Sequence, residues 1–217
     1  MYMNELKLEG VHHISCITAD ATANVEFYAG VMGMRLVKKT VNQDDPSVYH
    51  LFFGDEKGSP GFDLTFFEYP GARKGRAGAG MVHRILWRVA SGDALDFWKK
   101  RLADNSIETE RTPDGLLFAD PEGLHHELLV YGGTDERLVP GHIEVPPEFA
   151  LQGFHGARAY SASPQVTAQV LEEVMGFTPS EPGEWILEGD QRSGVYYLDP
   201  PPEERGIPSA GTVHHIA

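Results

Sequence analysis

The apolar positions at the start of the chain form short alternating runs, interrupted by one stretch with helical spacing. Alternation is typical of strands, and a recurrence every three or four residues is typical of a helix. Asp20 can cap that helix and Gly33 can end it. The helix carries Val25, Tyr28 and Met32 on one face, and strands are predicted at residues 11–17, 34–41, 48–53 and 62–69.

The same order of one strand, one helix and three strands recurs twice along the chain. Ser91 can cap a second helix, and Pro164 suits the first position of a third. The expected apolar faces are Leu95, Trp98 and Leu102 on the second helix, and Val166, Val170 and Val174, before Gly176, on the third. A fourth unit begins at Thr212 and contains one predicted strand.

A histidine at the start of each first strand marks the repeat. The four segments have an apolar residue, a histidine and then a β-prone stretch, and their first histidines are His12, His83, His155 and His214. We therefore predict an α+β fold of tandem βαβββ modules. Paired modules would join into curved, half-open mixed sheets with the helices outside. The expected modules are residues 1–72, 78–132 and 151–203, with a linker at 133–150 and the first strand of a truncated fourth module at 211–217.

Composition narrows the classes of partner. The 217 residues carry 18 Lys and Arg against 32 Asp and Glu, a net charge of −14. Such a surface repels phosphate backbones and anionic lipids, so we expect neither nucleic acid nor membrane as a partner. Cys16 is the single cysteine, which excludes an intrachain disulfide. The N-terminal residues do not resemble a secretory signal, which favours a cytoplasmic location. The basic run at residues 73–76 is expected to be a solvated loop between units.

These motifs resemble a known group of proteins. Repeated βαβββ units with a first-strand histidine, and the run at residues 120–128, resemble the vicinal-oxygen-chelate superfamily of glyoxalases, bleomycin-resistance proteins and extradiol dioxygenases. More narrowly, the chain is similar to ring-cleaving dioxygenases of the hydroquinone type. That similarity is carried by the segments at residues 10–14, 27–28, 49–54, 58–61, 74–76, 153–155 and 213–215.

The resemblance implies a catalytic Fe(II) or Mn(II) ion with His13 and His215 among its ligands. Units 2 and 3 carry Arg84 and Gly156 at the matching positions, and neither residue can bind a metal. One metal site is therefore predicted, formed by units 1 and 4, beside an empty pseudo-barrel of units 2 and 3. In the subgroup the third ligand is a glutamate of the fourth unit, which is expected beyond residue 217. Glu127 is the fallback ligand, although a structural role is favoured for it.

Strand alternation places His13, Ser15 and Ile17 on one face and His12 on the other. His12 and His214 are candidates for orienting the ligands or the substrate. The hydroxyl of Ser15 is a candidate for contacting substrate or bound oxygen. The alternative for all four histidines is a packing role within the repeat.

The resemblance implies cleavage of a dihydroxylated aromatic ring, a hydroquinone or a catechol, with insertion of O2. One alternative is a metal-dependent lyase or isomerase of the glyoxalase type. Another is a catalytically incomplete module that binds a small aromatic compound, since this chain carries two of the expected three ligands. An unpaired strand of the fourth unit would expose a sheet edge that favours a homodimer.

Overall fold

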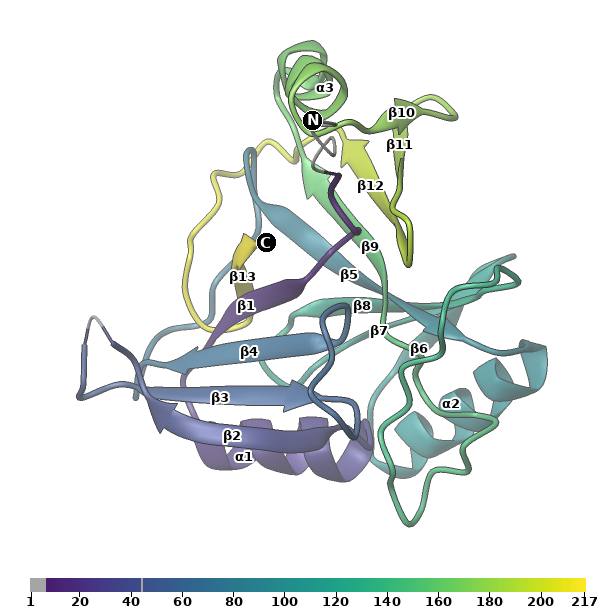
Figure 1. Ribbon diagram of the computed structural model, residues 1–217. Coiled ribbons are helices and arrows are strands. Elements are labelled where there is room, and N and C mark those ends of the chain that lie inside the picture. Colours follow the sequence, from purple (N-terminus) through teal and green to yellow (C-terminus); the bar gives the residue numbers. More distant parts are fainter. Residues whose placement is uncertain (1–6, 44) are drawn as a thin grey trace, which may run out of the picture.

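A computed structural model describes residues 7–43 and 45–217, and the strands form two separate mixed sheets (Figure 1). The five-stranded sheet has the order β13-β1-β4-β3-β2. Its strands are β1 (His13–Thr18), β2 (Arg35–Val41), β3 (Tyr49–Gly54), β4 (Asp63–Glu68) and β13 (Thr212–Ile216).

The second sheet has eight strands in the order β10-β11-β12-β9-β5-β8-β7-β6. Its strands are β5 (Val82–Val89), β6 (Thr109–Arg111), β7 (Gly115–Ala119), β8 (His125–Val130), β9 (Phe154–Tyr160), β10 (Thr178–Pro179), β11 (Glu184–Glu188) and β12 (Ser193–Asp199).

The pairing of strands shows how the repeats combine. Each of the first three units contains one parallel pair, namely β1–β4, β5–β8 and β9–β12. Units 1 and 4 join through the antiparallel pair β1–β13, and units 2 and 3 through β5–β9. The predicted α+β fold of βαβββ modules is confirmed, and neither sheet closes into a barrel.

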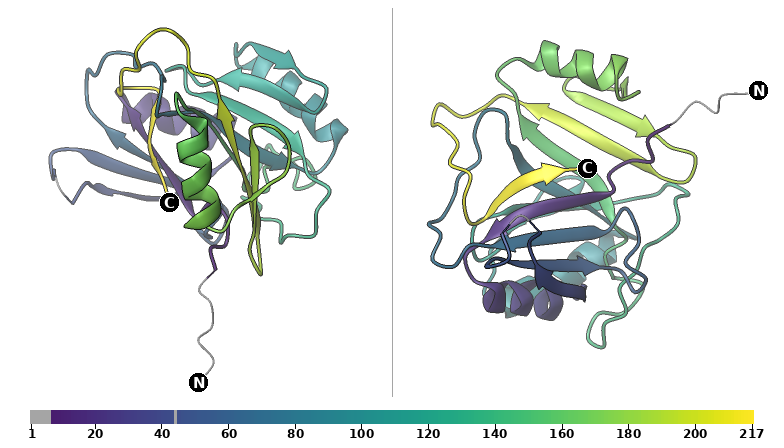
Figure 2. Two further views of the ribbon diagram at one scale, coloured as in Figure 1. Left: turned by 90° about the horizontal axis from the view of Figure 1, so that it is seen from above. Right: turned by 60° about the vertical axis from the view of Figure 1, so that its left-hand side comes forward.

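Three helical segments lie on the outer faces of the sheets (Figures 1 and 2). They are α1 (Ala21–Val25), which continues as a π-helical segment η1 (Glu26–Val31), α2 (Gly92–Asp104) and α3 (Pro164–Glu173). Asp20 caps α1 as predicted, because its Oδ1 accepts hydrogen bonds from the Thr22 and Ala23 amides at 2.9 and 3.0 Å. The π-helical turns have no counterpart in the sequence pattern, which fits an ordinary helix.

The valine face predicted for α3 is not buried. Val166, Val170 and Val174 are 64%, 47% and 78% exposed, whereas Leu171 is buried against residues of β9, β11 and β12. Leu171 lies five residues after Val166, about 140° around the helix. Packing through Leu171 therefore turns the valine stripe toward solvent.

Apolar side chains from the first two units form the main core. Ile14 and Cys16 of β1 are fully buried in it, together with Tyr28 of η1 and Trp87 of β5. The segment at 133–150 joins this core through Leu138, Val145 and Ala150. The connection between the second and third units is therefore packed against the core of the first two units.

The basic run at residues 73–76 is not simply a solvated loop. Lys74 and Arg76 form isolated β-bridges with Ala210 and Ile207, in the segment that leads to β13. These bridges fix the path of the chain between the two sheets.

None of the helices that the structure describes is long and apolar enough to cross a membrane.

Candidate metal centre

The junction between β1 and β13 brings the two predicted ligands together. Ser15 pairs with His215 and Cys16 with Val213, so His214 has no opposing residue in β1. An extra residue of this kind is a β-bulge, which redirects side chains and is frequent beside active sites. The bulge allows both His214 and His215 to approach the first histidine pair.

Four imidazoles form a chain across this junction. The Nε2 atoms of His13 and His215 are 3.2 Å apart. The Nδ1 atom of His12 lies 3.1 Å from Nδ1 of His13, and that of His214 lies 2.8 Å from Nδ1 of His215. His13 and His215 thus direct Nε2 at each other, and the Nδ1 atom of each contacts the histidine that precedes it in the sequence.

This arrangement differs from the alternation expected for the double histidines. His12 was expected on the opposite face from His13, yet the two ring centroids are 5.3 Å apart. His12 precedes the first residue of β1, and His214 is the bulged residue of β13. Strict alternation therefore does not govern either side chain.

The central pair fits a divalent metal ion. Two ligand nitrogens at about 2.1 Å from one ion and 3.2 Å from each other subtend an angle of about 100°, which suits adjacent coordination positions. Burial and the neighbouring His12 lower the pKa of His13. Burial and the neighbouring His13 and His214 lower the pKa of His215. Both imidazoles are therefore neutral at pH 7, as metal ligation requires.

Comparison with known proteins identifies the family. The profile of the Glyoxalase/Bleomycin resistance protein/Dioxygenase superfamily matches residues 10–128. The chain belongs to this superfamily. It is 42% identical over 218 residues to "Putative ring-cleaving dioxygenase MhqO" of Bacillus subtilis (strain 168), covering 97% of this chain and 69% of that protein.

Two further relatives extend the comparison. The chain is 32% identical over 199 residues to the chlorohydroquinone/hydroquinone 1,2-dioxygenase of Sphingobium indicum, covering 88% of this chain and 58% of that one. A crystal structure of a B. subtilis protein titled "putative dioxygenase" superimposes with a TM-score of 0.87 at 41% identity, covering 97% and 69% of the two chains. Glyoxalase I from Zea mays shares the fold, with a TM-score of 0.66 at 15% identity over 96% and 73%.

Three more side chains form a hydrogen-bonded row near the histidine pair, and the sequence pattern did not single out two of them. Ser15 is buried, and its hydroxyl lies 2.7 Å from Thr65 Oγ1. Thr65 Oγ1 in turn lies 3.0 Å from Nε2 of His50. The hydroxyl of Ser15, a candidate for contact with substrate, is thus engaged within the protein. Alternation along residues 49–54 and 62–69 is the signal that places His50 and Thr65 on one face.

Aromatic rings border the candidate metal centre. The His50 ring lies between Phe52 and Phe67, with centroid separations of 4.0 and 4.2 Å. Phe67 also contacts His214, at 5.5 Å between centroids. Burial, followed by the nearby His13 and His215, lowers the pKa of His50 to about 4. The row of rings formed by Phe52, His50 and Phe67 is therefore uncharged, and it offers a flat apolar surface beside the histidine pair.

Glu127, the fallback ligand, lies in the other sheet and is already paired. Its Oε2 accepts a hydrogen bond from Arg84 Nη1 at 2.9 Å. Glu127 is opposite Leu86 in the β5–β8 pair, and the equivalent place in unit 1, opposite Ser15, is held by Thr65. Among the described residues, no group of three histidine, cysteine or acidic side chains is placed to hold a metal. His13 and His215 are thus brought together without a carboxylate from units 1–3.

Proposed function

We propose that this chain carries the metal-binding histidines of a ring-cleaving dioxygenase that acts on a dihydroxylated aromatic ring, a hydroquinone or a catechol. The observation that carries the proposal is the pair of neutral imidazoles, His13 and His215, with Nε2 atoms 3.2 Å apart beside a row of aromatic rings. The names of the Bacillus and Sphingobium relatives support ring cleavage and a hydroquinone-type substrate.

The metal in the proposal is Fe(II) or Mn(II). His13 and His215 would hold it through Nε2, and a carboxylate outside the described surroundings of the pair would complete the set of two histidines and one acid used by non-haem iron oxygenases. Such an ion, when bound, would hold the diol and dioxygen side by side and exchange electrons with both. His12 and His214 would fix the orientation of the ligand rings through Nδ1.

The remaining roles fall to side chains of units 1 and 4. The substrate ring would stack on the row formed by Phe52, His50 and Phe67, which also shields the site from water. A diol hydroxyl must lose a proton before ring cleavage. With Nε2 of His13 and His215 on the metal, their Nδ1–H groups would donate to Nδ1 of His12 and His214, which would then carry hydrogen on Nε2 and could donate it in a hydrogen bond to the resulting oxyanion. In the overall reaction one ring carbon–carbon bond breaks and both oxygen atoms of O2 enter the product.

A catalytically incomplete module that binds aromatic compounds is the second candidate. It is favoured by the lack of a third ligand near the pair among the described residues. The two candidates differ in oxygen consumption, since a binding module consumes none. A glyoxalase-type lyase would also consume no oxygen, but it would work with Zn(II), Ni(II) or Co(II).

Oxygen uptake tests the proposal. Purified protein supplied anaerobically with Fe(II) or Mn(II), then mixed with aerated hydroquinone or catechol, is expected to consume one O2 per ring opened. His13→Ala and His215→Ala should abolish this uptake. His142→Asn is the matched control, because His142 lies in a loop after β8, and its Nδ1 accepts only a local hydrogen bond from the Glu144 amide. No uptake above the metal-only background with either substrate would contradict the proposed reaction.

A further inference from the structure

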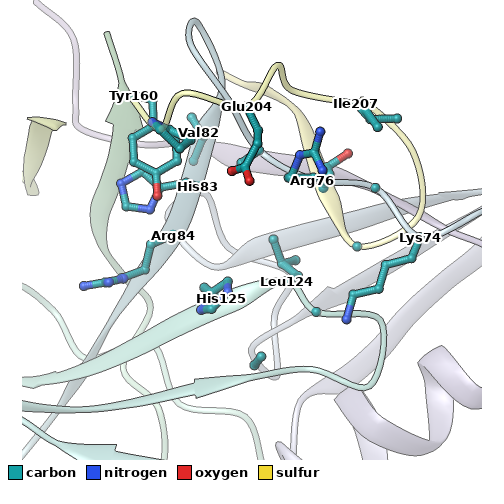
Figure 3. Close-up of a pocket in the computed structure, with 17 residues that line it drawn as sticks. Lys74, Arg76, Val82, His83, Arg84, Leu124, His125, Tyr160, Glu204 and Ile207 are labelled. Atoms are coloured by element: carbon teal, nitrogen blue, oxygen red, sulfur yellow. The ribbon is translucent and has the colours of Figure 1, made fainter. Parts of the chain in front are cut away.

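A cavity of about 680 Å³ lies between strands of units 2 and 3 and the segments that lead to β5 and β13 (Figure 3). The starts of β5 and β8 and the end of β9 line one side, and segments 74–77 and 202–212 line the other. Neither His13 nor His215 belongs to its lining. Its volume is within the range of about 300–1,000 Å³ that is typical of small-molecule sites.

Positive charge predominates in this cavity. Lys74, Arg76 and Arg84 line it, against a single lining carboxylate, Glu204. The chain as a whole has a net charge of −14. A basic cavity in an acidic protein attracts anions locally, although the rest of the surface repels them.

Two of the three cations have no acidic partner. Arg84 donates to Glu127, but Arg76 donates to the backbone carbonyl oxygen of Arg205, at 2.9 Å from Nη2. Within the described part of the chain, no carboxylate lies within 4.0 Å of the charged nitrogens of Lys74 or Arg76. The Lys74 side chain passes over Gly123, where an added Cβ would meet its Cε at 2.5 Å. The ammonium group is thus held beside the cavity without a counterion.

The same cavity offers flat and apolar surface. The Tyr160 ring stacks on His83, with centroids 3.9 Å apart and an angle of 12° between the planes. Leu124, which is largely buried, also lines the cavity, and Val82 lies beside Tyr160 (Figure 3). Burial lowers the pKa of His83, although its Nε2 lies 2.7 Å from Asp199 Oδ2, so the stacked ring is neutral rather than cationic. The lining therefore suits a ligand with a planar apolar part and an anionic group.

We propose that this cavity binds a small aromatic carboxylate, with the carboxylate near Lys74 and Arg76 and the ring against Tyr160 and Leu124. The site is separate from the candidate metal centre and does not depend on the proposed dioxygenase activity. Binding would use the repeat pair that lacks metal ligands.

Calorimetric titration with benzoate tests this site. The protein is first freed of divalent metal with a chelator, so that benzoate cannot bind to an ion at His13 and His215. Benzoate is expected to bind saturably at one site per chain, and His13→Ala should bind it equally well. The neutral analogue benzamide should bind at least about threefold more weakly, as expected for loss of a partly solvated ion pair.

Three variants locate the bound carboxylate. Lys74→Met should weaken benzoate binding about threefold, and Glu204→Gln, which removes the lining carboxylate, should strengthen it by a similar factor. Lys99→Met on the exposed face of α2 is the matched control and should leave binding unchanged. The proposal is overturned if benzoate does not bind, if benzamide binds as tightly, if Lys74→Met and Lys99→Met behave alike, or if His13→Ala removes binding.

Discussion

The β1–β13 and β5–β9 junctions occupy equivalent places in the repeat but carry different chemistry. Ser15 lies opposite His215 in the first, and Leu86 lies opposite Gly156 in the second. Where the first junction has His13, the second has Arg84, whose charge is balanced by Glu127. One junction thus presents neutral imidazole nitrogens, and the other presents an ion pair.

The difference extends to the backbone. Gly156 lies in β9 against Val195 of β12, and an added Cβ would overlap with the Val195 carbonyl oxygen. A histidine cannot occupy this position unless the strands separate. Strand packing as well as residue type therefore excludes a histidine at this position of the second junction.

The largest expected effect on the free energy of unfolding comes from Gly156→Ala. The methyl group would be forced against the backbone of β12, which cannot yield as a flexible side chain can. We expect the free energy of unfolding to fall by at least about 3 kcal/mol, at the upper end of overpacking effects. Urea unfolding followed by circular dichroism measures the change.

Gly92→Ala provides the control for that variant. Gly92 begins α2, and nothing lies within 4 Å of an added Cβ. Its unfolding free energy should stay equal or rise slightly, because alanine restricts the unfolded chain. Equal stability of the two variants would show that β9 and β12 can separate, and that strand packing does not exclude a second ligand.

A smaller effect is expected from Asp135→Asn, which weakens the ion pair behind the second junction. Asp135 Oδ2 accepts from Arg88 Nη1 at 2.6 Å and from the Ser193 amide at 2.9 Å. Burial acts to raise the pKa of Asp135, but these hydrogen bonds outweigh it and lower the pKa to about 2. Loss of the charged acceptor should cost about 1–3 kcal/mol at pH 7.

The pH dependence of that variant follows from the direction of the shift. The folded-state pKa of about 2 lies below the ordinary value of 3.8, so the contribution of Asp135 is complete above pH 3.8. It is lost as the pH falls through the folded-state pKa. The difference in unfolding free energy between parent and variant should therefore shrink below pH 3.8. A difference that is constant across this range in urea titrations would contradict a role for the carboxylate charge.

The smallest expected effect is on metal affinity at the β1–β13 junction. His12→Ala and His214→Ala each remove a ring that holds Nδ1 of a proposed ligand, while both Nε2 atoms stay in place. Metal affinity should fall about tenfold in each, as for other residues that orient metal ligands. Anaerobic titration with Mn(II) followed by electron paramagnetic resonance measures it. Unchanged affinity in both would mean that neither histidine orients a metal ligand.

The periodic pattern was sufficient for the fold, because each βαβββ unit has a bare sheet face that another unit must cover. The pairing of units 1 and 4 was predicted from the double histidines that they share and from the family resemblance. The repeated double histidine singled out His13 and His215, but their assignment as metal ligands came from the resemblance to dioxygenases and stays a prediction. The bulge at His214 could not be predicted, since it depends on how β13 pairs with β1. His50 and Thr65 were missed because their roles come from neighbouring strands rather than from a local motif. The exposed valines of α3 show that an apolar stripe does not by itself specify the buried face.

The most direct test of the account is the metal content of the protein isolated anaerobically, compared with His13→Ala, His215→Ala and the control His142→Asn. Elemental analysis should find close to one iron or manganese ion per chain in the parent and the control, and almost none in the other two variants. Metal retained in His13→Ala or His215→Ala, or a parent protein that binds none even when supplied with Fe(II) and Mn(II), would contradict the assignment of the β1–β13 junction as the metal centre.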